Sequence, residues 1–154
     1  MEVTIAKLSK HQISIFFSEN TSSTQHQCDQ EAERIMGMPV HASSLQGATS
    51  YTVVSDDETC VIQFRSASYA LDIDLLQCVE QAYMGFMPHH QWVGYLGDLY
   101  VYKMGNVGGI SMYLARDLLC KNNFSLLRQT VSDFARSVIT NVPYDPSPHI
   151  KETA

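Results

Sequence analysis

The sequence predicts an α+β fold, in which a five-stranded, mostly antiparallel sheet carries a packed helix and is followed by two or more C-terminal helices. Three β-type segments at residues 41–46, 50–55 and 59–65 are separated by turns so short that only antiparallel neighbours can form. A helical pattern over residues 69–84 then precedes two more β-type segments and two helical ones. This order of elements is the basis for the predicted fold class.

The first two elements are predicted from residues 3–17 and 22–36. Alternation of Ile13, Ile15 and Phe17 indicates one or two short strands. In the second segment, Ser23 or Thr24 can cap a helix and Gly37 can end it. We therefore expect a strand region followed by a helix.

The central elements follow from residues 41–104. The three β-type segments are joined by turns at 46–48 and 56–58, which predicts an antiparallel meander. The helix over 69–84 is expected to stop before Pro88, and strands at 91–95 and 99–104 share the turn 96–98. Glycines at 105, 108 and 109 then precede helices over 110–119 and 124–139.

Composition and charge restrict the function classes. The 154 residues, 45% of them hydrophobic, suit one domain over 1–142, followed by a proline-rich, flexible tail over 143–154. No apolar run approaches the roughly 20 residues that cross a bilayer, and no signal peptide precedes the fold, so we expect a cytoplasmic protein that binds no membrane. A net charge of −6 without a basic stripe argues against nucleic-acid binding.

The four cysteines show no metal-binding or redox spacing. Because no Cys-x-x-Cys pair occurs, we expect free thiols that act as small buried hydrophobic residues, namely Cys28, Cys60, Cys78 and Cys120. His89 and His90 follow the predicted helix stop, and adjacent strand residues point to opposite faces, which opposes shared binding of one ion. A surface or capping role is the alternative to a general base or a metal ligand, and no metal site is expected.

Four segments, at residues 45–53, 60–66, 70–88 and 99–109, resemble the amino-terminal lobe of the aminoglycoside and choline kinases, especially divergent fungal members. The resemblance covers about residues 25–140. It implies that the glycine loop, with Gln46, Gly47, Thr49 and Ser50, binds a ligand through backbone N–H groups.

The resemblance also implies roles for residues on both sides of the predicted helix. Arg65 stands where these kinases generally have lysine, with Asp72 or Asp74 as its carboxylate partner. Such a pair either charges a pocket or is a salt bridge that ties the helix to the sheet. Residues 100–104 resemble the hinge that contacts adenine, although alternation alone fits an ordinary core strand equally well.

Tyrosines around this hinge suggest acid–base chemistry. The hydroxyls of Tyr95, Tyr100 and Tyr102, with Lys103 nearby, could protonate or orient a carbonyl-bearing ligand. Tyr100, Lys103 and Met104 are predicted to bind that ligand. The alternative is that these tyrosines are core residues with solvated hydroxyls. Arg65, Asp74 and Tyr102 are the predicted catalytic residues.

The catalytic lobe of a kinase is missing from the sequence. After Phe124 the chain contains no His-Gly-Asp or His-Arg-Asp triplet and no Asp-Phe-Gly or Asp-x-Asp triplet, the motifs that position an acceptor alcohol and Mg²⁺. We therefore expect no phosphate transfer by this chain alone and no cofactor, with ATP and Mg²⁺ only as a residual binding activity.

Three functions remain open at this point. The first is a small-molecule pocket protein of fungal secondary metabolism that catalyses a cyclisation or isomerisation by acid–base chemistry. The others are a non-catalytic binding or regulatory module, and the amino-terminal piece of a larger kinase. Apolar residues at 110–119 and 124–139 would be exposed without a second lobe, which predicts a homodimer through that surface.

Overall fold

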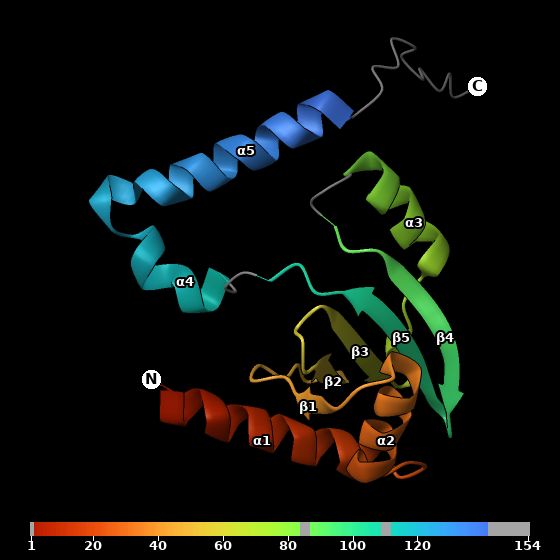
Figure 1. The fold of residues 1–154 in the computed structure, drawn as a ribbon. Coiled ribbons are helices and arrows are strands. Elements are labelled where there is room, and N and C mark those ends of the chain that lie inside the picture. The colour runs from red at the N-terminus through yellow and green to blue at the C-terminus, as the bar shows by residue number, and fades with distance from the viewer. Residues whose placement is uncertain (1, 84–86, 109–111, 142–154) are drawn as a thin grey trace, which may run out of the picture. The chain divides into compact units, whose positions relative to one another are not determined.

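The computed structural model, which describes residues 2–83, 87–108 and 112–141, confirms the α+β class. Its five strands form one antiparallel sheet in the order β1-β2-β3-β5-β4 (Figure 1). The strands are β1 (Val40–Ala42), β2 (Ser50–Ser55), β3 (Cys60–Arg65), β4 (His90–Leu96) and β5 (Leu99–Gly105). The α-helices are α1 (Glu2–Glu19), α2 (Gln25–Met36), α3 (Ile73–Ala82), α4 (Met112–Leu119) and α5 (Ser125–Asn141). Two 3-10 turns, η1 (Ala67–Tyr69) and η2 (Asn122–Phe124), complete the described elements.

The chain divides into two compact units. Unit 1 comprises Met1–Glu80 and Gly85–Gly108 and holds the sheet, α1, α2 and most of α3. Unit 2 comprises Gln81–Met84 and Gly109–Ala154 and holds α4 and α5. The single domain over 1–142 stays a prediction, and the proline-rich segment 143–154 lies outside the described residues.

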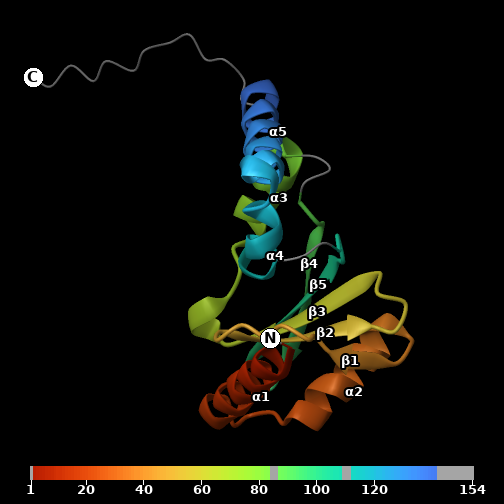
Figure 2. The ribbon, with the colours of Figure 1, turned by 90° about the vertical axis from the view of Figure 1, so that its left-hand side faces the viewer.

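The hydrophobic core of unit 1 lies between the sheet and the first two helices. Helices α1 and α2 lie on the same side of the sheet (Figure 2). Alternate residues of β2, β3 and β5 point to that side, so their apolar side chains meet those of the helices. The buried cluster consists of Phe16, Cys28, Ala32, Tyr51, Val53, Ile62, Phe64, Leu99 and Val101.

Helix α1 corrects the prediction of strands over residues 3–17. Phe16 is buried, and Ile13 and Phe17 pack against the same cluster, a spacing of three and four residues that matches one face of a helix. Ser9, one turn earlier, donates a hydrogen bond from Oγ to the carbonyl oxygen of Ser44 at 2.7 Å. The alternation of Ile13, Ile15 and Phe17 was misleading because the helical contacts fall on a different subset of the apolar residues.

Helix α2 confirms the predicted cap and stop. The Thr24 side chain accepts a hydrogen bond from the Gln27 N–H, and the Gln27 side chain accepts one from the Thr24 N–H, which together form a capping box. Gly37 ends the helix with φ of +72°, a conformation that glycine adopts without steric cost.

Strand β1 ends at Ala42, earlier than the predicted segment 41–46, and beyond it the Ser43 N–H and the Gln46 side chain both bond to Thr52. The buried Gln46 amide donates from Nε2 to the Thr52 carbonyl at 2.7 Å and accepts from the Thr52 N–H at 3.0 Å. This amide therefore satisfies both backbone groups of Thr52, as a further strand residue would do. Gln46, predicted to bind a ligand, is a structural residue in this arrangement.

The remaining elements follow the predicted order with shifted ends. Helix α3 begins at Ile73 because η1 and a short extended segment occupy the start of the predicted range 69–84, and it ends at Ala82. Helices α4 and α5 confirm the two C-terminal helices, although residues 110 and 111 lie outside the described part. Within the described residues, no helix combines the length and apolar character that a membrane span requires.

Candidate functional site

Four aromatic residues form a continuous row on the sheet face opposite the core. Tyr102 pairs with Trp92 across β5 and β4, and Tyr100 pairs with Tyr95. The ring centroids lie 5.3 Å apart for Trp92 and Tyr95, 4.7 Å for Tyr95 and Tyr100, and 6.5 Å for Tyr100 and Tyr102. These spacings suit the edge-to-face and stacked contacts that aromatic pairs favour. We call these four residues the aromatic row.

A β-bulge in β4 makes this row possible. Trp92 and Tyr95 are three residues apart, so regular alternation would place them on opposite faces of the sheet. The register shifts between Trp92 and Gly94, which leaves Val93 as the extra residue and returns Tyr95 to the Trp92 face. Gly94 has φ of +136°, a conformation that side chains other than hydrogen rarely permit.

The aromatic row forms the floor of a groove of about 480 Å³. The wall of the groove is formed by the segment that leads into α3 and by the first turn of that helix. Its lining residues are Leu71, Asp72, Ile73 and Asp74. Trp92 and Tyr95 are 46% and 57% exposed, so an incoming molecule can reach their rings. Of the residues predicted to form a site, Asp72, Asp74, Tyr100 and Tyr102 all line this sheet-face groove.

Tyr102 fixes the wall of the groove to its floor. The residue is only 2% exposed, and its hydroxyl oxygen accepts a hydrogen bond from the Leu71 N–H at 3.0 Å. Because the oxygen acts as acceptor in that contact, the hydroxyl proton remains for a second partner. Farther along the row, a hydrogen bond with Tyr100 raises the pKa of Tyr95, with smaller contributions from desolvation and from the neighbouring tyrosine charges.

Two carboxylates lie at the α3 end of the groove. Asp72 accepts a hydrogen bond from the Leu75 N–H to Oδ1 at 2.9 Å, which caps the N-terminus of α3. Asp74 lies in the first turn of the helix, where a negative charge interacts favourably with the helix dipole. Both residues are exposed, so the groove combines aromatic rings with negative charge.

Arg65 does not form the predicted ion pair with Asp72 or Asp74. Its Nε donates to Gln63 Oε1 at 3.0 Å and its Nη1 donates to the Tyr69 carbonyl at 3.4 Å. Among the described residues no carboxylate lies within salt-bridge distance of this guanidinium. Partial burial lowers the pKa of Arg65, which is a half-buried structural cation beneath the Tyr69 segment.

The other predicted ligand-binding residues do not line the groove. Gly47 and Thr49 belong to the connection between β1 and β2, and Ser50 is the buried first residue of β2. Lys103 alternates with Tyr102 along β5 and pairs with the core residue Ile62, so it points to the opposite side of the sheet. Met104 shares the Tyr102 face but pairs with Val61 and His90 at the far end of β5.

A polar clamp around Glu80 was not predicted. The Glu80 carboxylate accepts hydrogen bonds from His89 Nδ1 at 2.9 Å, from His90 Nδ1 at 3.0 Å and from the His90 N–H at 2.6 Å. The hydrogen bond with His89 is the largest cause that lowers the pKa of Glu80 to about 2. Desolvation, the second largest effect, opposes it, and the two His90 contacts lower the pKa further. Both histidines therefore point to one carboxylate. His89 lies just before β4, which begins at His90. The strand alternation that would point these two histidines to opposite faces therefore does not apply.

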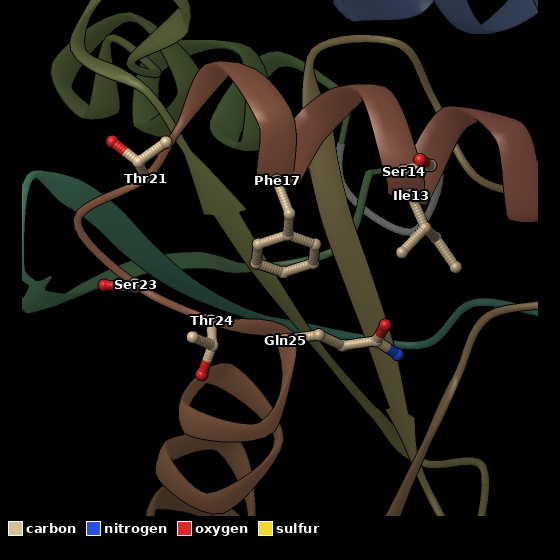
Figure 3. A pocket seen from close by; sticks show the side chains of 7 residues that line it. All are labelled: Ile13, Ser14, Phe17, Thr21, Ser23, Thr24 and Gln25. Carbon is tan, nitrogen blue, oxygen red and sulfur yellow. The ribbon is translucent and has the colours of Figure 1, made fainter.

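A second hollow of about 400 Å³ lies where α1 meets the start of α2 (Figure 3). Ile13 and Phe17 project from α1 toward the start of α2, and the other lining residues are Ser14, Thr21, Ser23, Thr24 and Gln25. Ser23 Oγ donates to the Leu96 carbonyl at 3.0 Å, and Thr24 caps α2.

The Gln25 side chain at this hollow is also held by the protein. Its Nε2 donates to the buried Tyr51 hydroxyl at 3.1 Å, and that hydroxyl donates to Asp29 Oδ1 at 2.6 Å. Burial raises the pKa of both Tyr51 and Asp29. Three of the polar side chains around the hollow thus stabilise the junction of α1, α2 and the sheet.

The cysteine thiols agree in part with the sequence analysis. All four cysteines are free, but only Cys28 is buried, and desolvation raises the pKa of its thiol to about 12. The described residues contain no group of three or more histidine, cysteine or carboxylate side chains placed to hold a metal ion.

Comparison with models of protein families, with curated proteins and with solved structures finds no match to this chain. The resemblance to the aminoglycoside and choline kinases therefore stays a prediction, and the groove has to be interpreted from its own chemistry.

Proposed function

We propose that this chain is a small-molecule-binding protein and that the sheet-face groove takes a flat, positively charged ligand. The observation that carries the proposal is the convergence of four aromatic rings and two carboxylates on one groove. Trp92 and Tyr95 offer exposed ring surface for stacking, and Tyr102 has a hydroxyl proton to donate. The groove volume of about 480 Å³ lies within the usual range for small-molecule sites.

Charge is the feature that selects among flat ligands. A cation above an aromatic ring gains on the order of 0.5–2 kcal/mol, depending on how far it is desolvated. Asp72 and Asp74 add direct attraction from the α3 side, although their exposure to solvent weakens it. The two carboxylates would repel an anionic ligand, so the groove favours cations over anions of the same shape.

The first test uses the only tryptophan of the chain, which lies in the groove. Trp92 fluorescence is recorded while N-methylacridinium, a flat cation, or acridine, its uncharged analogue near neutral pH, is added. We expect both to quench Trp92 and the cation to bind about tenfold more tightly. The Asp72→Asn/Asp74→Asn double variant should lose most of that preference, whereas Asp56→Asn, in the turn after β2, should keep it.

Each outcome bears on a different part of the proposal. Equal affinity for the two probes would remove the charge selectivity and leave a groove for neutral aromatic molecules. If neither probe quenched Trp92, the groove would not be a ligand site. Saturable binding of ATP with Mg²⁺ instead would favour the amino-terminal piece of a larger kinase, an origin that the element order also suggests.

A second candidate is acid–base catalysis of a cyclisation or isomerisation in the same groove, without phosphate transfer. The specific observation in its favour is that the Tyr102 hydroxyl and the Asp74 carboxylate line one groove. A probe for proton abstraction is the ring opening of 5-nitrobenzisoxazole, a flat molecule that reports on a general base. Turnover that is lost in Asp74→Asn and retained in Asp56→Asn would support catalysis, and a rate equal to that of free carboxylate would leave the non-catalytic binding module.

A further inference from the structure

We propose that the sheet-face groove also binds a proline-rich segment of a partner protein, with a lysine or arginine beside its prolines. This inference rests on the groove of the proposed function, and it adds a peptide partner to the small molecules considered there. Every residue that lines the groove belongs to unit 1, so the features that select the partner are set within that unit.

The angles between the aromatic rings are the first feature that suits prolines. The rings of Trp92 and Tyr95 meet at 74°, and those of Tyr95 and Tyr100 meet at 69°. Rings that meet so steeply enclose notches between their faces, and the exposed surfaces of Trp92 and Tyr95 leave these notches open. Aromatic-lined grooves hold the compact rings of successive prolines in an extended segment.

The hydrogen-bonding groups of the groove are the second feature. Trp92 offers its indole N–H, which can only donate, and among the described residues no group accepts a hydrogen bond from it. The Tyr102 hydroxyl accepts from the Leu71 N–H, so its proton is available to another acceptor. A proline-rich segment in the polyproline II conformation has no internal hydrogen bonds, and its prolines lack N–H groups. Such a segment presents carbonyl acceptors, which match the two donors of the groove.

The openness of the groove favours a ligand that is already rigid. Trp92 and Tyr95 remain about half exposed, so they cannot enclose a bound molecule on all sides. A ligand that loses little conformational entropy on binding needs fewer contacts to reach the same affinity. Proline-rich segments adopt polyproline II before they bind, whereas a flexible peptide would have to be ordered by these rings.

Charge around the groove selects a basic residue next to the prolines and gives the segment a direction. Asp72 and Asp74 lie at the α3 end of the groove. On the β3 side of the tyrosines, Arg65 pairs with Tyr100 across β3 and β5, and its guanidinium donates to the Tyr69 carbonyl. The carboxylates attract a lysine or arginine, and Arg65 opposes its placement beside β3. The basic residue of the segment should therefore lie at the α3 end.

The test adds octaproline peptides to the full chain and follows the emission of Trp92, its only tryptophan. Octaproline with a terminal lysine should shift this emission saturably, and the same peptide with a terminal glutamate should bind about fivefold more weakly. A glycine–serine peptide of equal length with the same lysine should give no saturable shift, because it has no proline rings and is flexible.

Two matched pairs of variants locate the peptide. Tyr95→Ala should weaken the binding of octaproline–lysine about tenfold. Tyr69→Ala, at an exposed tyrosine that does not line the groove, should leave it unchanged. The Asp72→Asn/Asp74→Asn double variant should lose the preference for lysine over glutamate, whereas Asp56→Asn should keep it. Far-ultraviolet circular dichroism checks that each variant retains the secondary structure of the wild type.

The proposal would be wrong if N-methylacridinium bound and no octaproline peptide did, a result that leaves the proposed function in place. It would also be wrong if the glycine–serine peptide bound as tightly, since charge alone would then explain the affinity. Unchanged affinity in Tyr95→Ala, or failure of octaproline–lysine to displace N-methylacridinium, would place the peptide outside the groove and overturn the proposal. Octaproline–lysine binding without a preference for N-methylacridinium over acridine would remove the flat-cation function and keep the peptide site.

Discussion

The two faces of the sheet are built from the same strands but are covered in different ways. On one face, Tyr51, Ile62, Phe64 and Val101 are buried beneath α1 and α2. On the other face, the neighbouring residues of β4 and β5 form the aromatic row, and two of its four rings remain largely exposed. One face therefore stabilises the fold, and the other leaves aromatic surface accessible to a ligand.

The helices on the two faces are attached by different forces. Helices α1 and α2 contribute Phe16, Cys28 and Ala32 to the core, whereas α3 has no buried residue. Polar contacts hold α3 instead, through the Tyr102 hydroxyl at its N-terminal side and the Glu80 clamp near its end. The wall of the groove is therefore held by a few hydrogen bonds, and these contribute less to stability than a packed core does.

The largest difference between the faces should appear when one ring is removed from each. Phe64→Ala, in the core, should lower the free energy of unfolding by about 3–5 kcal/mol through lost burial and a cavity. Tyr95→Ala, on the open face, should lower it by less than about 1 kcal/mol while weakening N-methylacridinium binding. Urea titration and Trp92 quenching measure the two quantities, and similar destabilisation by both would contradict the comparison.

Removal of one buried hydroxyl tests the polar junction beneath the core. Tyr51→Phe deletes the donor to Asp29 and the acceptor for Gln25, and it should lower the free energy of unfolding by about 1–3 kcal/mol. Because burial already raises the pKa of Asp29, loss of the donor should raise it further, so the variant should lose more stability as the pH rises from about 4 to 7. The double variant with Asp29→Asn should remove that pH dependence.

A single added methyl group, at Gly94, should destabilise the bulge in β4. Gly94→Ala places a side chain at φ of +136°, and although no atom lies within 4 Å, the backbone strain should cost about 1–3 kcal/mol. If the strand rearranges to relieve the strain, Tyr95 leaves the aromatic row and ligand affinity falls as well. Gly105→Ala, also without a close neighbour and not at positive φ, is the matched control and should change stability by less than about 0.5 kcal/mol. Thermal unfolding and Trp92 quenching follow both effects.

The smallest expected effect concerns the Glu80 clamp. The pKa of Glu80 is lowered in the folded protein, so its stabilisation is present above the unfolded value near 4.3 and is lost as the pH falls toward about 2. Glu80→Gln should flatten the loss of stability over that window, whereas Glu19→Gln, at the end of α1, should not. Acid titration followed by circular dichroism measures the difference, and identical curves for wild type and Glu80→Gln would show that the clamp contributes nothing.

Local signals in the sequence were sufficient for several elements. The cap at Thr24, the stop at Gly37 and the short turn between β2 and β3 depend on residues within a few positions of one another, and the structure confirms them. Residues Tyr100 and Tyr102 were placed correctly in one strand, and alternation alone puts them on the same face. Their meeting with Asp72 and Asp74 followed from the position of α3 beside that face.

Other features depended on contacts between residues far apart in the sequence. Helix α1 was predicted as strands because its apolar pattern fits both periods, and only packing of Phe16 against the sheet distinguishes them. The Glu80 clamp joins residues that are nine and ten positions apart and carries no motif. Arg65 lost its predicted partner because Asp72 caps α3 and the Tyr69 carbonyl lies closer to the guanidinium.

The sequence by itself determined the α+β class, the antiparallel meander and the absence of a kinase catalytic motif after Phe124, because each depends on local pattern or on composition. Only the tertiary structure decided which residues form the groove. A bulge of one residue moved Tyr95 to the face of Trp92, and the pairing of β4 with β5 aligned both with the tyrosines of β5. Register and side-chain direction arise from contacts between strands, which no single stretch of sequence contains.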